Sequence, residues 1–371
     1  MSDLEIVEPY DPFRDRTKAD PGAAGLEPVL SVRDLQVMFK TDDGIVQAVN
    51  GVSFDVFPNE ILGIVGESGS GKSVTSLAVL GLLPRTATVT GEITYRGEEL
   101  LGAPEKRLQA LRGDRIAMVF QDALAALNPV FRVGSQVGEA IKVHHPDVDR
   151  KELRERVVHL LDLVGIPDPA ARANQYPHEY SGGMRQRAMI AMAIANDPDV
   201  LIADEPTTAL DVTIQAQVLE VLERVQDQTN SAIILITHDL GVVAGLTDRV
   251  MVMYAGRPVE LAGVDDLFYD SRHPYTLGLL ASLPRLEDDS ELPLFHIPGR
   301  PPSLLSVPRG CAFHPRCPFA QLPEPCATTV PALRPAGEAS HFSACHLAEN
   351  MTDEDPVSLR ARSADEAGTR R

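Results

Sequence analysis

Short runs of consecutive apolar residues recur along the chain, and most have the length of a β-strand rather than of a helix. A strand that is apolar on both faces is typical of a parallel sheet covered by helices on each side. The runs that we expect to be such strands are residues 61–65, 115–120, 199–204 and 231–237. Residues 29–32 and 47–56, and a hairpin of residues 250–254 and 257–261, are further expected strands.

Between these strands, apolar residues recur at the spacing that predicts amphipathic or buried helices. The segments with this pattern are residues 74–83, 151–166 and 212–228. In the second of them, one face carries Leu153, Val157, Leu160, Leu161 and Val164. Strands that alternate with helices predict an α/β fold built on a parallel sheet.

The regular pattern stops at both ends of the chain and after about residue 285. Residues 1–28 and 351–371 are polar and lack sustained periodicity, so we expect flexible tails there. After residue 285 proline becomes dense, and all four cysteines of the 371-residue chain lie in this part. The sequence therefore predicts a large domain followed by a smaller, loop-rich module.

Composition argues against several classes of protein. Hydrophobic residues make up 44% of the chain, which is enough for a core. No apolar run reaches the roughly 18 residues that a membrane-spanning helix needs, and the N-terminus lacks the pattern of a secretory signal. We therefore expect a cytoplasmic protein. The net charge of -19 disfavours a protein that binds the phosphate backbone of nucleic acid.

The strongest chemical signal is a phosphate-binding loop at residues 66–73. Its residues fit the pattern G-x-x-x-x-G-K-[ST] and are Gly66, Glu67, Ser68, Gly69, Ser70, Gly71, Lys72 and Ser73. An expected strand precedes the loop and an expected helix follows it, which is the setting that this motif requires. Glycines let consecutive main-chain N–H groups face a triphosphate, and the helix adds its positive N-terminal end. We expect Lys72 to reach the β- and γ-phosphates of ATP, and Ser73 to bind Mg²⁺.

Two adjacent carboxylates, Asp204 and Glu205, stand at the tip of the expected strand 199–204. We expect Asp204 to hold Mg²⁺, directly or through its waters. Glu205 is the expected general base, which orients and polarises the attacking water. An acidic turn after a strand is common by itself, but with a phosphate-binding loop it predicts a site for ATP hydrolysis.

Residues 180–184 connect these motifs to a known family. Their sequence, Tyr-Ser-Gly-Gly-Met, is similar to the L-S-G-G-Q signature of the ATP-binding cassette (ABC) family, with Tyr for Leu and Met for Gln. Ser181 can cap the helix that follows, and the two glycines allow backbone to approach phosphate. Further matches stand in the family's order over about residues 30–265, and they are Phe39, Gln121, Asp211 and His238.

The resemblance implies a role for each of these matches. Phe39 would stack on adenine, Gln121 would take part in Mg²⁺ binding and catalysis, and His238 would contact the γ-phosphate. Asp211 would belong to the D-loop, residues 209–211. The signature would contact ATP that is bound to a partner subunit, through Ser181, Gly182 and Gly183.

The ABC resemblance also implies an architecture. The cassette would span residues 29–270, with a RecA-like parallel sheet, an antiparallel β subdomain, and a helical subdomain at about residues 122–198. Two cassettes would face head to tail with ATP between them, so the chain would need a second ATPase subunit, either identical or a paralogue. ATP would close this pair and hydrolysis would reopen it, which would drive a membrane partner through the segment after Gln121.

The C-terminal part narrows the resemblance to one branch. Residues 271–280, 297–302 and 310–318 look like the C-terminal extension of oligopeptide/dipeptide importer ATPases, a group that also contains nickel importers. The match covers most of residues 260–346, so we expect this extension at residues 271–350. The implied partners are two membrane permeases and an extracytoplasmic peptide-binding protein, which would place the chain at the cytoplasmic face of the cell membrane.

The four cysteines suggest one tetrathiolate site. Cys311, Cys317, Cys326 and Cys345 have the spacing C-x₅-C-x₈-C-x₁₈-C within 35 residues. A reducing cytosol disfavours disulfides. Zinc modules usually show close C-x₂-C pairs, whereas an iron–sulfur cluster tolerates irregular spacing. Members of the resembled group can carry a 4Fe–4S cluster at these cysteines, so we expect a cluster first, zinc second, and free or disulfide-paired thiols last.

Together these patterns predict the ATP-hydrolysing subunit of an ABC importer for oligopeptides or dipeptides. An importer of nickel or another small solute is the alternative within the family. A soluble ABC ATPase that acts on nucleic acid is the rival from another class. It is disfavoured by the acidic charge and by the single set of motifs.

Overall fold

The computed structural model describes residues 26–208, 210–283, 295–337, 340–354, 356 and 358–359. The expected tails at residues 1–28 and 351–371 lie largely outside the described residues, and so does Ala209 of the expected D-loop. In the described part of the second tail, Met351 and Leu359 are buried beside Leu277 and Ala281. These two positions are therefore packed rather than free.

Within the described residues, eight strands form the main sheet, in the order β11-β12-β10-β9-β3-β8-β7-β6. The parallel centre consists of β3 (Ile61–Val65), β6 (Ile116–Val119), β7 (Val200–Asp204), β8 (Ala232–Thr237) and β9 (Arg249–Tyr254). β10 (Arg257–Gly263) returns antiparallel to β9. The expected buried strands and the hairpin are confirmed, with their ends shifted by one or two residues.

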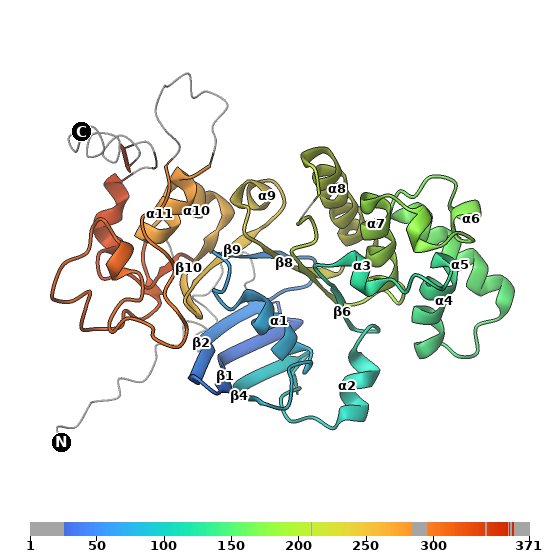
Figure 1. The fold of residues 1–371 in the computed structure, drawn as a ribbon, viewed down its shortest axis with the longest axis horizontal. Helices are drawn as coiled ribbons and strands as arrows, with labels where there is room; N and C mark the ends of the chain where they lie inside the picture. The colour runs from blue at the N-terminus through green and yellow to red at the C-terminus, as the bar shows by residue number, and fades with distance from the viewer. Residues whose placement is uncertain are drawn as a thin grey trace.

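The centre of this sheet is apolar on both faces because each face is covered. In β8, Ile234 and Ile236 belong to the core on one side, whereas Ile233 and Leu235 belong to the core on the other. Figure 1 shows α8 (Val212–Thr229), α9 (Leu240–Ala244), α10 (Val264–Tyr269) and α11 (Pro274–Ala281) on one side of the sheet. The other side is covered by α1 (Lys72–Val79) and a second sheet.

The second sheet, in the described part of the chain, is antiparallel and has the order β2-β1-β4-β5. Its strands are β1 (Leu30–Thr41), β2 (Gly44–Val56), β4 (Ala87–Tyr95) and β5 (Glu98–Glu99). β1 is much longer than the expected strand 29–32, and β4 was not expected. Exposed Thr and Glu side chains interrupt the apolar pattern of β4, so its strand signal is weak.

A group of helices lies at the far end of β6 and β7 (Figure 1). It contains α3 (Ala123–Ala126), α4 (Val133–His144), α5 (Arg150–Leu163), α6 (Pro169–Arg172), a 3₁₀ turn η1 (Pro177–Glu179) and α7 (Gly182–Ala193). The expected amphipathic stripe of α5 is confirmed, since Val157, Leu160 and Leu161 are buried against this group. α2 (Glu105–Leu111) joins β5 to β6. The expected domain boundaries stay predictions.

The C-terminal part is loop-rich, as expected, but it is continuous with the main sheet. Its short elements are η2 (His314–Arg316), β11 (Arg334–Pro335), β12 (Phe342–Ser343) and η3 (Ala348–Asp353). β12 pairs with β10, so the module extends the sheet of the large domain. His341 is buried and its Nε2 lies 2.7 Å from Glu260 Oε1, so this side chain connects the module to β10. Across the described ranges, every helix is too short or too polar to cross a bilayer.

Candidate nucleotide-binding site

The expected phosphate-binding loop connects β3 to α1 and borders a cavity of about 610 Å³. Residues 66–74 form one wall of this cavity, and Gln121, Glu205, His238 and Leu279 complete its lining. Leu279 lies on α11, whereas the loop, Gln121, Glu205 and His238 follow β3, β6, β7 and β8, whose carboxyl ends meet at one edge of the parallel sheet. Ligands of open α/β sheets bind at this edge.

Lys72 is held inside the loop by the loop's own carbonyl groups. Its Nζ donates to Gly66 O at 2.8 Å and to Glu67 O at 3.1 Å. Burial lowers the pKa of Lys72, while the charges of Glu205, Asp204 and Glu67 oppose that shift. The ammonium group is thus fixed beside the N-terminus of α1, where a phosphate oxygen can replace a carbonyl as its partner.

Ser73 and Asp204 meet although 131 positions separate them. Ser73 Oγ donates to Asp204 Oδ1 at 3.0 Å. Burial raises the pKa of Asp204, and the hydrogen bond from Ser73 acts in the opposite direction. A hydroxyl and a carboxylate beside a phosphate-binding loop fit Mg²⁺, which prefers oxygen ligands and also binds substrate phosphates.

Glu205 lies beside the two other residues that we expect to be catalytic, Gln121 and His238. Its Oε2 accepts from Gln121 Nε2 at 3.0 Å and from Thr208 Oγ1 at 2.8 Å, and His238 Nδ1 lies 3.6 Å away. The main-chain N–H of Glu205 donates to Ile236 O, which anchors the residue to β8. The arrangement can orient a carboxylate toward the cavity. Thr208 was missed by sequence reasoning, and its position three residues after Glu205 is the signal that could have found it.

The other expected contacts lie apart from this cavity. Phe39 sits half-buried on β1, paired across the sheet with Val46. Ser181 caps α7 by accepting from Met184 N at 3.3 Å, and Asp211 caps α8 by accepting from Ile214 N at 3.1 Å. Gly183 packs tightly on Ile214. These residues, with Gly182, are not among the described residues that line the cavity.

The four cysteines lie within the described residues as free thiols. Burial raises the pKa of Cys317 to about 12, and the other three thiols add to the rise. The main-chain N–H of Cys311 donates to Cys326 O at 2.9 Å, so the thiols share one neighbourhood, in which Cys326 and Cys345 are buried and Cys311 and Cys317 are half-buried. Main-chain N–H groups point at them, for example from Leu347 to Cys345 Sγ at 3.3 Å. However, no group of three or more His, Cys, Asp or Glu side chains in the described ranges is arranged to hold a metal ion.

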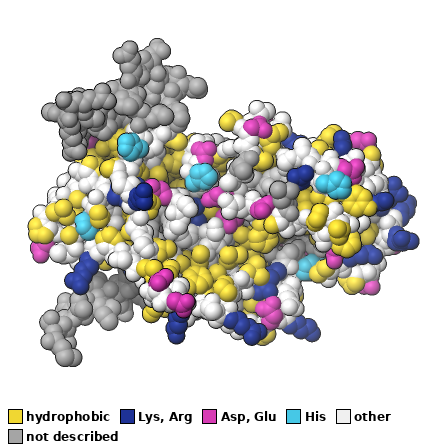
Figure 2. Space-filling view, viewed as in Figure 1, with side chains coloured by type: hydrophobic (Ala, Val, Ile, Leu, Met, Phe, Trp, Pro, Cys, Tyr) yellow, Lys and Arg dark blue, Asp and Glu magenta, His cyan; other side chains and the backbone are white. Residues whose placement is uncertain are grey.

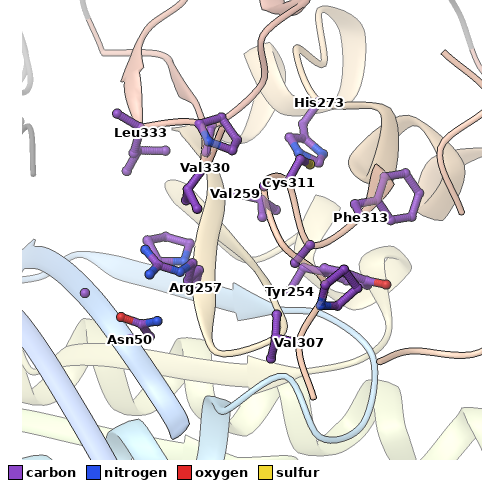
Figure 3. Close-up of a pocket in the computed structure, with 18 of the residues that line it drawn as sticks. Asn50, Tyr254, Arg257, Val259, His273, Val307, Cys311, Phe313, Val330 and Leu333 are labelled. Carbon is purple, nitrogen blue, oxygen red and sulfur yellow. The ribbon is translucent and has the colours of Figure 1, made fainter. Parts of the chain in front are cut away.

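A second cavity, of about 450 Å³, separates this cysteine neighbourhood from the antiparallel sheet (Figure 3). Asn50 from β2 and Arg257 from β10 lie on one side, and Cys311 and Phe313 lie on the other. The lining of this cavity does not include the phosphate-binding loop. Its lining residues come from both the C-terminal module and the large domain, so the two parts face each other across it.

Comparison with protein families gives two matches along the chain. A family model described as ABC transporter matches residues 49–208. A second, described as oligopeptide/dipeptide transporter, C-terminal region, matches residues 259–326. The first match contains the phosphate-binding loop and both carboxylates, and the second contains three of the four cysteines.

Curated relatives are similar over most of the chain. The oligopeptide transport ATP-binding protein OppD of Mycobacterium tuberculosis is 53% identical over 327 residues, or 88% of this chain and 53% of the relative. This chain thus spans about half the length of that relative. The dipeptide transport ATP-binding protein DppD of Bacillus subtilis is 54% identical, over 79% of this chain and 88% of the relative. OppD of Escherichia coli is 50% identical, over 82% and 89%.

Solved structures share the fold. The ATP-binding cassette MJ0796, in a dimeric post-hydrolysis state bound to ADP and Pi, has a TM-score of 0.57 at 24% identity, over 63% of this chain and 98% of that chain. cbiO1 of Clostridium perfringens, part of the transporter complex cbiONQ, has a TM-score of 0.56 at 26% identity, over 66% and 92%.

Proposed function

Because this chain belongs to the family of ABC transporter ATP-binding proteins, we propose that it binds and hydrolyses MgATP to power the import of oligopeptides or dipeptides. The observation that carries the ATPase assignment is the convergence of Gln121, Thr208 and His238 on Glu205, beside the phosphate-binding loop. The C-terminal family match and the relatives named for peptide transport support the cargo class over nickel or nucleic acid.

In this proposal the loop's N–H groups and Lys72 bind the phosphates of ATP. Ser73, Asp204 and the amide oxygen of Gln121 hold Mg²⁺, which neutralises charge on the phosphates. Glu205 takes a proton from the attacking water, and Gln121 and His238 keep its carboxylate and the water in line with the γ-phosphate. The buried position of Asp204 and Lys72 strengthens these charge interactions by limiting access of bulk water.

We further propose that the site is completed by a second ATPase subunit, identical or a paralogue. Ser181 and Gly182 are exposed at the N-terminus of α7 and do not line this chain's own cavity. Helix N-termini with glycines suit phosphate, which supports assigning these residues, with Gly183, to ATP bound on the partner. Phe39 and Asp211 would act in the same closed pair, on adenine and at the subunit contact.

The membrane partners that we propose are two permeases, with an extracytoplasmic peptide-binding protein in the complex. The loop after Gln121 supports this assignment because it exposes two apolar residues to solvent. Val130 is 69% exposed and Phe131 is 56% exposed. Gln136 fixes the loop by bonding Asn128 and Phe131 main-chain groups at 2.8 to 3.0 Å. The chain would then sit at the cytoplasmic face of the membrane. On the face in Figure 2, Lys and Arg form small groups among acidic and apolar side chains rather than one basic patch.

The decisive experiment on the ATPase assignment is Glu205→Gln. We expect MgATP to bind normally and turnover to fall by roughly 10²- to 10⁴-fold, the usual contribution of a general base. Glu223→Gln, at an exposed position of α8, is the matched control and should behave as wild type. Normal hydrolysis by the Glu205 variant would remove this residue from the catalytic role.

At the four cysteines we propose a 4Fe–4S cluster, with zinc as the alternative. A single zinc ion at about 2.3 Å from each sulfur needs thiols only about 3.8 Å apart. The support for a cluster is that all four thiols lie close enough for the other three to raise the pKa of Cys317, and that main-chain N–H groups face them, as at Cys345. Brown colour and bound iron and sulfide, lost in Cys317→Ser, would support the cluster. Colourless, zinc-containing protein purified without oxygen would reject it.

A further inference from the structure

Resting on the proposed function, we infer that Arg316 and Tyr275 are positioning residues for the phosphate-binding loop. Both belong to the C-terminal part of the chain, outside the motifs of the ATPase cassette. Both hold Glu67, the second residue of the loop. The C-terminal module would therefore set the affinity of this chain for its nucleotide.

Arg316 holds the side chain of Glu67 with two parallel hydrogen bonds. Its Nη1 donates to Glu67 Oε2 at 2.6 Å and its Nη2 donates to Glu67 Oε1 at 3.0 Å. The side chain of Arg316 is 5% exposed and that of Glu67 is 28% exposed. A bidentate arginine–carboxylate pair fixes both the distance and the orientation of the carboxylate.

Tyr275 holds the main chain of the same residue. The N–H of Glu67 donates to Tyr275 Oη at 2.9 Å, and Tyr275 is fully buried in α11. The carbonyl of Glu67 in turn accepts from Lys72 Nζ. The same carbonyl also accepts from Ser70 N at 3.2 Å. Every polar group of Glu67 thus has a partner, and two of its four partner residues come from the C-terminal part.

Arg316 is itself immobilised by the residues around it. Its Nε donates to Pro298 O at 2.9 Å, and its guanidinium lies 5.8 Å from the ring centre of Tyr254 and 6.0 Å from that of Phe313. Cation–π contacts of this kind orient a guanidinium. The rings of Tyr254 and Phe313 are 5.3 Å apart, and both border the second cavity (Figure 3).

The same turn of chain carries two of the four cysteines. His314 N donates to Cys311 O, Arg316 N donates to Phe313 O, and Cys317 N donates to His314 O. Arg316 therefore cannot move independently of residues 311–317. By linkage, whatever orders this turn favours the nucleotide-binding shape of the loop, and nucleotide binding orders the turn in return.

The expected effect is on nucleotide affinity rather than on the chemical step. The phosphate-binding loop binds through main-chain N–H groups, whose directions must be fixed before binding if affinity is to be high. Releasing Glu67 leaves Glu205 and Asp204 in place. We therefore expect a higher Kd and KM for the nucleotide, with kcat nearly unchanged.

The experiment is a titration of the purified full chain with MgADP, followed by steady-state ATPase kinetics. Arg316→Lys keeps the charge but loses the bidentate geometry, and Glu67→Gln loses the charge. We expect each to raise the Kd by about tenfold, a factor that corresponds to about 1.4 kcal/mol. The double variant should be no weaker than either single one, because the two residues form one interaction. Tyr275→Phe removes one hydroxyl without changing shape, and we expect a smaller rise of the Kd, of roughly threefold.

Arg33→Lys is the matched control. Arg33 also pairs with a carboxylate, on β1 and β2, where its Nη2 donates to both oxygens of Asp55 at 2.7 Å. This variant should keep the wild-type Kd even if its unfolding midpoint falls. The inference is overturned if Arg316→Lys and Glu67→Gln bind MgADP with the wild-type Kd. It is also overturned if the Kd of Arg33→Lys rises as much as theirs. If wild type itself fails to bind, or Lys72→Ala binds equally well, the proposed function fails instead.

Discussion

Alanine at Gly71 tests whether the shape of the phosphate-binding loop is set by main-chain crowding. Gly71 has a φ of +102°, and a Cβ built there would lie 2.4 Å from Ala48 O, a main-chain atom of β2. Real Cβ atoms do not approach other atoms this closely, so the loop and the strand must move apart. Gly69 offers a matched comparison, because its φ of +80° is also left-handed but nothing lies within 4 Å of its Cβ position.

The two substitutions should lower the free energy of unfolding by different amounts, because only Gly71→Ala also causes overpacking. A left-handed backbone costs about 1–2 kcal/mol for alanine, and the reduced freedom of the unfolded chain returns about 0.4–1 kcal/mol. Gly69→Ala should therefore cost between about 0 and 1.6 kcal/mol. Gly71→Ala adds the cost of overpacking, about 1–3 kcal/mol. We expect the free energies of unfolding of the two variants to differ by about 2 kcal/mol, with Gly71→Ala the less stable.

Chemical denaturation of both variants, followed by circular dichroism, measures this difference. The wild-type protein and both variants should share one slope with denaturant, so that the midpoints report free energy. Equal midpoints for the two variants would show that the loop can accommodate a Cβ at position 71 without loss of stability. The crowding between Gly71 and β2 would then not define its shape.

Two more predictions concern buried charge. His273 is 1% exposed, its Nδ1 accepts from Tyr275 N, and burial lowers its pKa from 6.5 to about 3. Its contribution to stability is therefore complete above pH 6.5 and is lost as the pH falls toward 3, by about 2 kcal/mol at pH 5. His273→Asn should abolish that part of the pH dependence of the unfolding midpoint, and an unchanged dependence would contradict a buried neutral histidine. Glu60→Gln should cost about 3–5 kcal/mol, because the buried guanidinium of Arg249, 2.5 Å from Glu60 Oε1, would lose the negative charge that this carboxylate supplies. Replacing both residues by Met should recover most of this loss in urea denaturation, and an equal loss would show that the charge is not the cause.

The parallel sheet and the gathering of the phosphate-binding loop with Gln121, Glu205 and His238 at one cavity were predictable because their signals are local. A strand that is buried on both faces, such as β8, is a continuous apolar run, and the loop at residues 66–73 has a fixed sequence pattern. Because β6, β7 and β8 are parallel, their carboxyl ends bring Gln121, Asp204 and His238 to one edge of the sheet. β4 could not be found in this way, because it alternates with exposed polar residues and obtains its order from pairing with β1.

The contacts of the C-terminal part were beyond sequence reasoning for a different physical reason. Arg316 and Glu67 are 249 positions apart, and neither residue type signals a partner. The cysteines drew attention to residues 311–317 as a metal-binding segment, whereas the structure shows Arg316 within it reaching into the phosphate-binding loop. Likewise β12 is only two residues long, and it is a strand because β10 offers it an edge.

This arrangement bears on how a loop-rich segment can be stable. The segment after α11 has few regular elements, so its own hydrogen bonds and core can order it only weakly. Its attachments to the large domain include the strand pair β12–β10, the buried contact of His341 with Glu260, and the ion pair of Arg316 with Glu67. Two of these attachments end on the sheet, and the third ends on the nucleotide-binding loop. If this segment loosens, the contact of Arg316 with Glu67 is lost, so we expect its stability and the affinity of the proposed ATP site to change together.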